Sequence, residues 1–151
     1  MNTLFIFLNI IGLSLLVNNK QFTDCQDLLT QYAERPDHLE IVSCDVHEDN
    51  AQIVNATTYK VSGEYAAEIE QFLVKKYGMG KLKFVCCGWE PENGQLGQHS
   101  SKQLTQLHPN YVLGINMYAS WELGNEKEGS LHGEMDQTKF DFYIVVTIYD
   151  V

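Results

Sequence analysis

Four cysteines are the residues of this chain whose chemistry depends most on their spacing. Cys86 and Cys87 are adjacent, whereas Cys25 and Cys44 stand alone. In a small domain in an oxidising compartment, an even number of cysteines favours disulfide bonds over free thiols. The spacing lacks both the C-x-x-C motif of thioredoxin-like redox sites and the paired ligands of structural zinc sites. All four cysteines are therefore predicted to form structural disulfides, and we expect no metal and no cofactor.

The pairing of the cysteines depends on the element that carries the adjacent pair. Residues 81–89 (KLKFVCCGW) are expected to form a strand, and side chains alternate between the two faces of a strand. Alternation favours a bond from each of Cys86 and Cys87 to one of Cys25 and Cys44. The other pairing, Cys25–Cys44 with a Cys86–Cys87 ring, requires a strained turn that a following glycine could supply. Four cysteines allow three pairings, and the sequence leaves the choice open.

No other group of residues has the spacing of a familiar catalytic site. The five histidines are scattered singly, and neither a G-x-S-x-G nucleophile elbow nor a phosphate-binding loop occurs. Acidic pairs such as Glu90 and Glu92 are interpreted as solvated charges in turns. The residues therefore favour a protein without enzymatic activity, with redox chemistry at the adjacent cysteines as the alternative.

Charge and aromatic residues indicate what kind of partner the protein binds. The chain has 20 acidic and 10 basic residues, all after position 19, and a net charge of -10. Such a surface repels nucleic-acid phosphates and anionic lipids, and it favours a basic protein as partner. Aromatic side chains with acidic neighbours are typical of surfaces that bind basic proteins. The candidate binding surface consists of Trp89, Tyr111, Tyr118, Trp121 and Glu122.

Residues 1–19 are predicted to be a signal peptide. Residues 4–17 (LFIFLNIIGLSLLV) are almost entirely apolar and carry no charge. This run is too short for a membrane-spanning helix and has the length of a signal-peptide core, although no lysine or arginine precedes it. We expect residues 20–151 to form a single exported domain, periplasmic or secreted, because this length accommodates one hydrophobic core.

Hydrophobic periodicity predicts seven elements in the exported part. Helices are expected at residues 24–33 and 64–77, where apolar side chains recur at helical spacing. Strands are expected at residues 39–46, 53–61, 81–89, 110–121 and 139–149. The order α-β-β-α-β-β-β predicts an α+β fold, with two helices packed on one face of a mostly antiparallel sheet. Long polar loops are expected between the later strands.

The sequence also predicts details of the two helices. Thr23 or Asp24 is expected to cap the first helix, and Gly78 is expected to end the second. Phe72 and Leu73 are expected to be buried against the sheet. On that basis Phe72→Ala would cost about 3–5 kcal/mol of stability, as a large-to-small core substitution.

Residues 59–90 (YKVSGEYAAEIEQFLVKKYGMGKLKFVCCGWE) resemble the core of a family of small exported bacterial proteins classed as a domain of unknown function. Members of that family have a Y-x-V-x-G step, an amphipathic helix that ends in a glycine, and a strand that ends in CCGWE. The resemblance covers residues 25–151, and its specific part is the helix with the CCGWE segment. It implies a periplasmic or secreted location and no assigned activity, and it supplies no catalytic residues.

These features predict a small, disulfide-stabilised, acidic exported protein that acts as a binding or accessory protein. An inhibitor or immunity protein for a basic toxin or hydrolase would have these properties. The alternative is a thiol–disulfide redox protein that uses Cys86 and Cys87.

Overall fold

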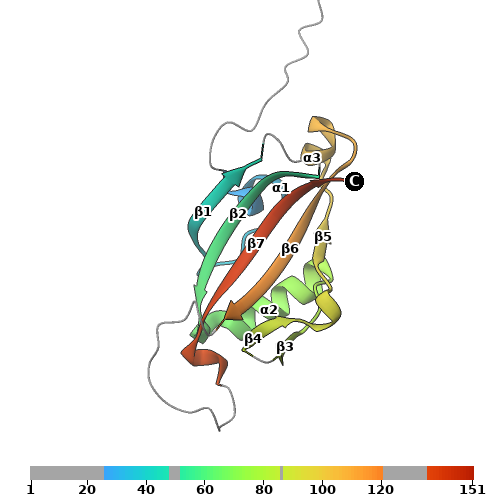
Figure 1. The fold of residues 1–151 in the computed structure, drawn as a ribbon. Helices are drawn as coiled ribbons and strands as arrows, with labels where there is room; N and C mark the ends of the chain where they lie inside the picture. The colour runs from blue at the N-terminus through green and yellow to red at the C-terminus, as the bar shows by residue number, and fades with distance from the viewer. Residues whose placement is uncertain (1–25, 48–51, 86, 121–135) are drawn as a thin grey trace, which may run out of the picture.

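The computed structural model describes residues 26–47, 52–85, 87–120 and 136–151 (Figure 1). Within these ranges, seven strands form one sheet in the order β1-β2-β7-β6-β4-β3, and β5 pairs with β6 beside β4. Every strand pair is antiparallel. The elements are α1 (Leu28–Tyr32), β1 (Glu40–Val46), β2 (Ile53–Ser62), α2 (Gly63–Tyr77), β3 (Leu82–Val85), β4 (Gly88–Pro91), η1 (Glu92–Gly94), β5 (Gly97–His99), α3 (Lys102–Leu107), β6 (Tyr111–Ser120), η2 (Gln137–Lys139) and β7 (Asp141–Asp150).

Strand β7 lies between β2 and β6 and forms the centre of the sheet. Its sequence alternates apolar and more polar residues, and one set of side chains is completely buried. This set consists of Phe142, Ile144, Val146 and Ile148. The predicted strand at residues 139–149 is thereby confirmed, except that Lys139 is the last residue of the short η2 helix and β7 begins at Asp141.

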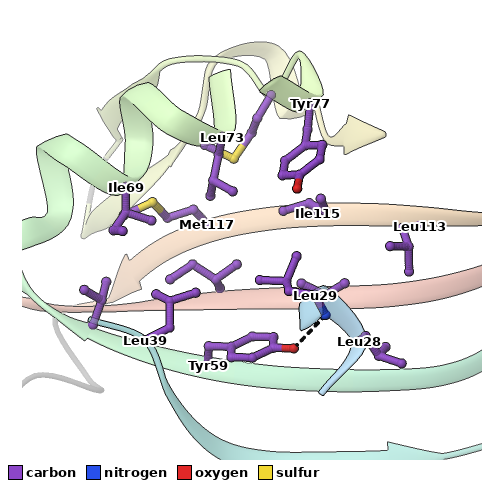
Figure 2. Close-up of a cluster of buried hydrophobic side chains, with 14 of the residues drawn as sticks. Leu28, Leu29, Leu39, Tyr59, Ile69, Leu73, Tyr77, Leu113, Ile115 and Met117 are labelled. Atoms are coloured by element: carbon purple, nitrogen blue, oxygen red, sulfur yellow. Dashed lines mark hydrogen bonds between the residues drawn. The ribbon is translucent and has the colours of Figure 1, made fainter. Parts of the chain in front are cut away.

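All three α-helices contribute to one hydrophobic core against the same face of the sheet (Figures 1 and 2). Helix α1 provides Leu28 and Leu29, α2 provides Leu73, and α3 provides Leu104, all of them inaccessible to solvent. The sheet provides Tyr59 and the alternating apolar residues of β6 and β7. A mostly antiparallel sheet with helices on one face was therefore predicted correctly, whereas α3 was not predicted.

The predicted single strand at residues 81–89 is wrong. The chain forms β3, reverses after Val85 and returns as β4, with Val85 opposite Gly88. The reversal lies between Val85 and Gly88, so the alternation argument for the bonding of Cys86 and Cys87 does not apply. A Cβ atom on Gly88 would lie 2.2 Å from the carbonyl oxygen of Ala119, and glycine therefore allows β4 to approach β6.

The start of the first helix also differs from the prediction. Helix α1 begins at Leu28, and its N-cap is Asp27, whose carboxylate accepts a hydrogen bond from the Thr30 amide. Thr23 and Asp24, the predicted caps, lie outside the described residues. The predicted end of the second helix is confirmed, because Gly78 follows α2 in the left-handed conformation with φ 72°.

Regular structure is present where the sequence predicted only a long polar loop. Residues 91–109 contain η1, β5 and α3. Helix α3 is capped by Ser101, whose hydroxyl accepts a hydrogen bond from the Leu104 amide. Both β5 and α3 are too short to show a hydrophobic period in the sequence. Their formation therefore depends on packing against β6.

Phe72 is less buried than the sequence predicted, and Val42 on β1 is exposed. Phe72 is only half-buried at the edge of the core, whereas its neighbour Leu73 is fully buried. Val42 is 45% exposed, because a shift in register between Ile41 and Ser43 interrupts the alternation of β1.

The predicted signal peptide, residues 1–19, lies outside the described residues. None of the helices that the structure describes is long and apolar enough to span a membrane.

Candidate functional site

The face of the sheet opposite the described helices carries a group of aromatic side chains near the surface. We call it the open face, and no helix of the described ranges packs on it. Strand registers place its residues side by side on four strands. They are Glu40, Ser43 and Asp45 of β1, Ala56, Thr58 and Lys60 of β2, Asp141, Tyr143, Val145, Thr147 and Tyr149 of β7, and Val112, Gly114, Asn116 and Tyr118 of β6.

Three tyrosines form the aromatic part of the open face. Tyr118 and Tyr143 are registered partners on β6 and β7, and their rings stack with centroids 5.9 Å apart and planes 28° apart. Tyr149 lies over Gly114, where an added Cβ atom would be 2.4 Å from the tyrosine ring. All three side chains are half-buried, so each ring is supported by the sheet and still reaches solvent.

The charged residues of the open face are mainly acidic. On β1, β2, β6 and β7 the open-face carboxylates are Glu40, Asp45 and Asp141, and the basic side chain is Lys60. At the edge of the sheet, Lys83 of β3 is the registered partner of Glu90 of β4 on the same face. Lys60 Nζ lies 2.7 Å from Asp141 Oδ2, and this hydrogen bond raises the pKa of the lysine. The lysine is thus neutralised by one carboxylate, and two carboxylates are left over.

The structure does not bring the predicted binding residues together on one surface. Tyr118 lies on the open face, but Tyr111 is on the other face of β6 and packs against the core. Trp89 also packs against the core, edge-on to Phe84 with centroids 5.6 Å apart. Trp121 and Glu122 lie outside the described residues.

Sequence reasoning missed Tyr143 and Tyr149. The signal was present, because both alternate with the buried residues of β7 and must therefore point away from the core. Tyr118 alternates in the same way with the buried residues of β6. The prediction selected aromatic residues by position in the chain, whereas the face of the sheet decides which of them can act together.

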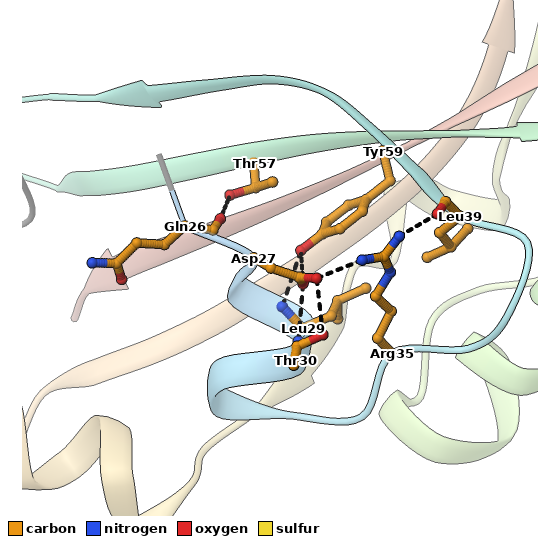
Figure 3. A network of polar contacts seen from close by, with 8 residues as sticks. All are labelled: Gln26, Asp27, Leu29, Thr30, Arg35, Leu39, Thr57 and Tyr59. Atoms are coloured by element: carbon orange, nitrogen blue, oxygen red, sulfur yellow. Dashed lines mark hydrogen bonds and ion pairs between the residues drawn. The ribbon is translucent and has the colours of Figure 1, made fainter. Parts of the chain in front are cut away.

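A polar network ties α1 to β2 on the core face of the sheet (Figure 3). The buried hydroxyl of Tyr59 donates to Asp27 Oδ1 at 2.8 Å and accepts from the Leu29 amide at 3.0 Å. Arg35 donates to Asp27 Oδ2 at 2.6 Å and also to the carbonyl of Leu39. Each member is bonded to another part of the fold, so we assign the network a structural role.

A side-chain hydrogen bond from β2 holds the backbone at Gln26, just before α1. The Thr57 hydroxyl donates to the carbonyl oxygen of Gln26 at 2.7 Å (Figure 3). Thr57 is fully buried on β2 and is the registered partner of Cys44 on β1. The backbone at Gln26 therefore lies against the part of the sheet that carries Cys44.

A second polar group lies near the C-terminus. His108 Nδ1 is 3.6 Å from Asp150 Oδ1, and the imidazole packs on the ring of Tyr111 with centroids 4.8 Å apart. Burial and the nearby Asp150 raise the pKa of Tyr111. Within the described ranges, no cluster of three histidine, cysteine or carboxylate side chains could hold a metal ion.

The structure describes two of the four cysteines. Neither Cys44 nor Cys87 is a free thiol. Cys44 lies on the edge strand β1, and the exposed Cys87 lies in the turn that connects β3 to β4. Cys25 and Cys86 lie outside the described residues, directly beside Gln26 and Cys87 in the chain.

Residues 16–89 match the family model described as a domain of unknown function, DUF4952. The match confirms the resemblance to a domain of unknown function, and among the described elements it includes α1, β1, β2, α2, β3 and the start of β4. The open face uses β1 and β2 from the matched segment and β6 and β7 from beyond it. No curated protein and no solved structure matches the chain.

Proposed function

We propose that this protein is an exported, disulfide-stabilised acidic domain that binds a basic protein through the open face of its sheet. The observation that carries the proposal is the stacked pair Tyr118–Tyr143 on a face that no described helix covers. Tyrosine is enriched among residues that dominate binding energy, because it offers a large contact area at a small entropic cost.

The shape of this face supports a role in binding. Its aromatic rings come from the two central strands, β6 and β7, which pair over eight consecutive residues from Tyr111 to Tyr118. The ring of Tyr149 fits over Gly114 because glycine has no side chain to occupy that space. Side chains that are ordered before binding lose less conformational entropy when a partner arrives.

Charge supports a basic partner. The whole chain has a net charge of -10, and the described part of the open face has four carboxylates and two ammonium groups. Carboxylates around an aromatic centre attract lysine and arginine side chains and increase the rate of association at low salt. An inhibitor or immunity protein for a basic toxin or hydrolase has this chemistry.

Titration with a short oligolysine peptide tests the location of binding. The expected result is that backbone amide NMR signals of β6, β7 and β2 shift on addition of the peptide. The shifts should weaken as salt is raised, because exposed charges are screened over about 8–10 Å at physiological ionic strength. A glycine–serine peptide of equal length is the control. Shifts confined to α2 and α3 would contradict the proposal.

Tyr118→Ala tests the contribution of the aromatic pair. We expect the dissociation constant for the oligolysine peptide to rise by about tenfold or more, since a binding hot spot contributes at least 1–2 kcal/mol. Tyr65→Ala is the matched control, because Tyr65 lies on α2 and stacks on His38 away from the open face. Equal affinities of the Tyr118→Ala variant and the unmodified protein would rule out the open face as the binding surface.

A further inference from the structure

The stacked tyrosine pair of the open face lies beside an ion pair. Asp141 precedes Tyr143 by two residues on β7, so both side chains point to the same face, about 7 Å apart along the strand. Lys60 on β2 is the registered partner of Tyr143. Its Nζ atom extends past that position to Asp141 Oδ2, at 2.7 Å. Two aromatic rings and a carboxylate that already binds a cation are therefore neighbours on one surface.

The ion pair between Lys60 and Asp141 is accessible to solvent. The two side chains are 34% and 26% exposed. Ion pairs with this exposure contribute little to stability, because water and salt screen them. Another cation can therefore replace Lys60 on Asp141 at a small cost to the fold.

Glu40 provides a second carboxylate for the displaced lysine. Glu40 is exposed on β1 and is the registered partner of Lys60, directly opposite it. Opposite charges at such positions attract each other across the two strands. Lys60 can therefore exchange Asp141 for Glu40 and keep a carboxylate beside it. Asp141 then becomes available to a ligand that lies over the tyrosine rings.

A lysine of the partner would gain less at this position than an arginine. It would only replace one ammonium group by another on the same carboxylate. A guanidinium group is planar and stacks on aromatic rings, and it also donates two parallel hydrogen bonds to one carboxylate. The rings of Tyr118 and Tyr143, with planes 28° apart, and the carboxylate of Asp141 offer both kinds of contact.

We infer that the open face binds an arginine side chain of its partner, with the guanidinium stacked on the Tyr118–Tyr143 pair and hydrogen-bonded to Asp141 in place of Lys60. The inference rests on the proposed function and specifies the side chain that the open face recognises. Lys60 is then a built-in competitor. Only a ligand that contacts both the rings and the carboxylate gains from displacing it.

Binding of oligoarginine and oligolysine peptides of equal length tests the preference for arginine. Isothermal titration calorimetry measures both dissociation constants. We expect oligoarginine to bind about three- to tenfold more tightly, which is the range that a cation–π contact provides. Tyr143→Leu keeps an apolar side chain and removes the stacked ring, so the preference should fall below about twofold. An unchanged preference in this variant would overturn the inference.

Lys60→Met tests the displacement, because it keeps the apolar stem and releases Asp141. We expect the affinity for oligoarginine to rise about three- to tenfold, since a competing cation is removed. Lys75→Met is the matched control. It changes the net charge equally, at an exposed position on α2, which packs on the other face of the sheet. An equal or larger effect of Lys75→Met would show that net charge alone matters and would overturn the inference.

NMR spectroscopy of the unmodified protein gives a result that depends on no variant. Protons that lie over the face of an aromatic ring shift upfield. We expect the arginine δ-methylene signals of the bound peptide to shift upfield and to show nuclear Overhauser contacts to the ring protons of Tyr118 and Tyr143. The ε-methylene signals of bound oligolysine should shift less. Equal upfield shifts in the two peptides would contradict the stacking of a guanidinium.

The outcomes separate this inference from the proposed function. If both peptides shift the amide signals of β6 and β7 and bind with equal affinity, the open face binds basic proteins without distinguishing arginine, and only the inference fails. If neither peptide binds at the open face, the proposed function fails together with the inference.

Discussion

Replacing Phe142 by alanine is expected to lower the free energy of unfolding by about 3–5 kcal/mol. Phe142 is on the central strand β7, is inaccessible to solvent, and is registered opposite the buried Val61 of β2. Removal of its ring leaves a cavity in the hydrophobic core between the sheet and the helices. Urea unfolding of the variant and of the unmodified protein measures the difference.

Phe72→Ala is the matched control, because it removes the same side chain from a half-buried site. Phe72 lies at the edge of the core, edge-on to Tyr77 with centroids 5.8 Å apart, and Lys76 Nζ lies 5.5 Å from its ring centroid. Solvent can fill the space that is left, so we expect less than half the loss found at Phe142. The loss expected from the structure is smaller than the loss of about 3–5 kcal/mol that the sequence alone predicted for Phe72→Ala. Equal losses at both sites would show that α2 buries Phe72.

The general fold was predictable because long elements carry a clear hydrophobic period. The alternation of β7 and the apolar stripe of α2 identified both elements, and Gly78 correctly marked the end of the helix. The sequence also led to a sheet with helices on one face, since antiparallel strands with one apolar side need such a cover.

The hairpin at the adjacent cysteines was missed because its strands are only four residues long. The sequence of residues 81–89 is equally compatible with one continuous strand. The contact that favours the hairpin is between Gly88 and the backbone of Ala119 on β6. That contact joins segments about thirty residues apart. A local pattern does not contain this information, and the alternation argument for the pairing of the cysteines rested on the single strand.

The candidate site was only partly predictable for a related reason. Tyr118 was selected for its aromatic ring, but its partner Tyr143 comes from a strand later in the chain. Their juxtaposition depends on the register of β6 against β7, which packing of the opposite face determines. Once the buried side chains of β6 and β7 are known, alternation along each strand identifies the residues of the open face.

Asp27→Ala is expected to lower the free energy of unfolding by about 2–4 kcal/mol, because it removes an N-cap and unpairs two groups. Helix α1 loses the acceptor for the Thr30 amide, and the buried Tyr59 hydroxyl loses the acceptor for its proton. Arg35 loses its carboxylate partner. Asp27→Asn is the control, because asparagine keeps a capping oxygen and removes the charge. We expect a smaller loss for asparagine, and equal losses would show that capping contributes nothing.

The pH dependence of stability isolates the charge of Asp27. Burial on its own would raise the pKa of this carboxyl, but hydrogen bonds from Thr30, Tyr59 and Arg35 outweigh burial and lower the pKa below 3.8. The folded state therefore favours the carboxylate. Its stabilisation is complete above the unfolded-state pKa of about 3.9 and is lost as the pH falls through the lower folded-state pKa.

The difference in unfolding free energy between the unmodified protein and Asp27→Asn should therefore be constant from about pH 7 to pH 5. Below about pH 4 it should shrink, because the unmodified protein then loses the same charge by protonation. Urea unfolding at a series of pH values measures both regimes. If the difference instead grew on acidification, the folded state would favour the neutral acid, and the network of Asp27, Tyr59 and Arg35 would not stabilise a carboxylate.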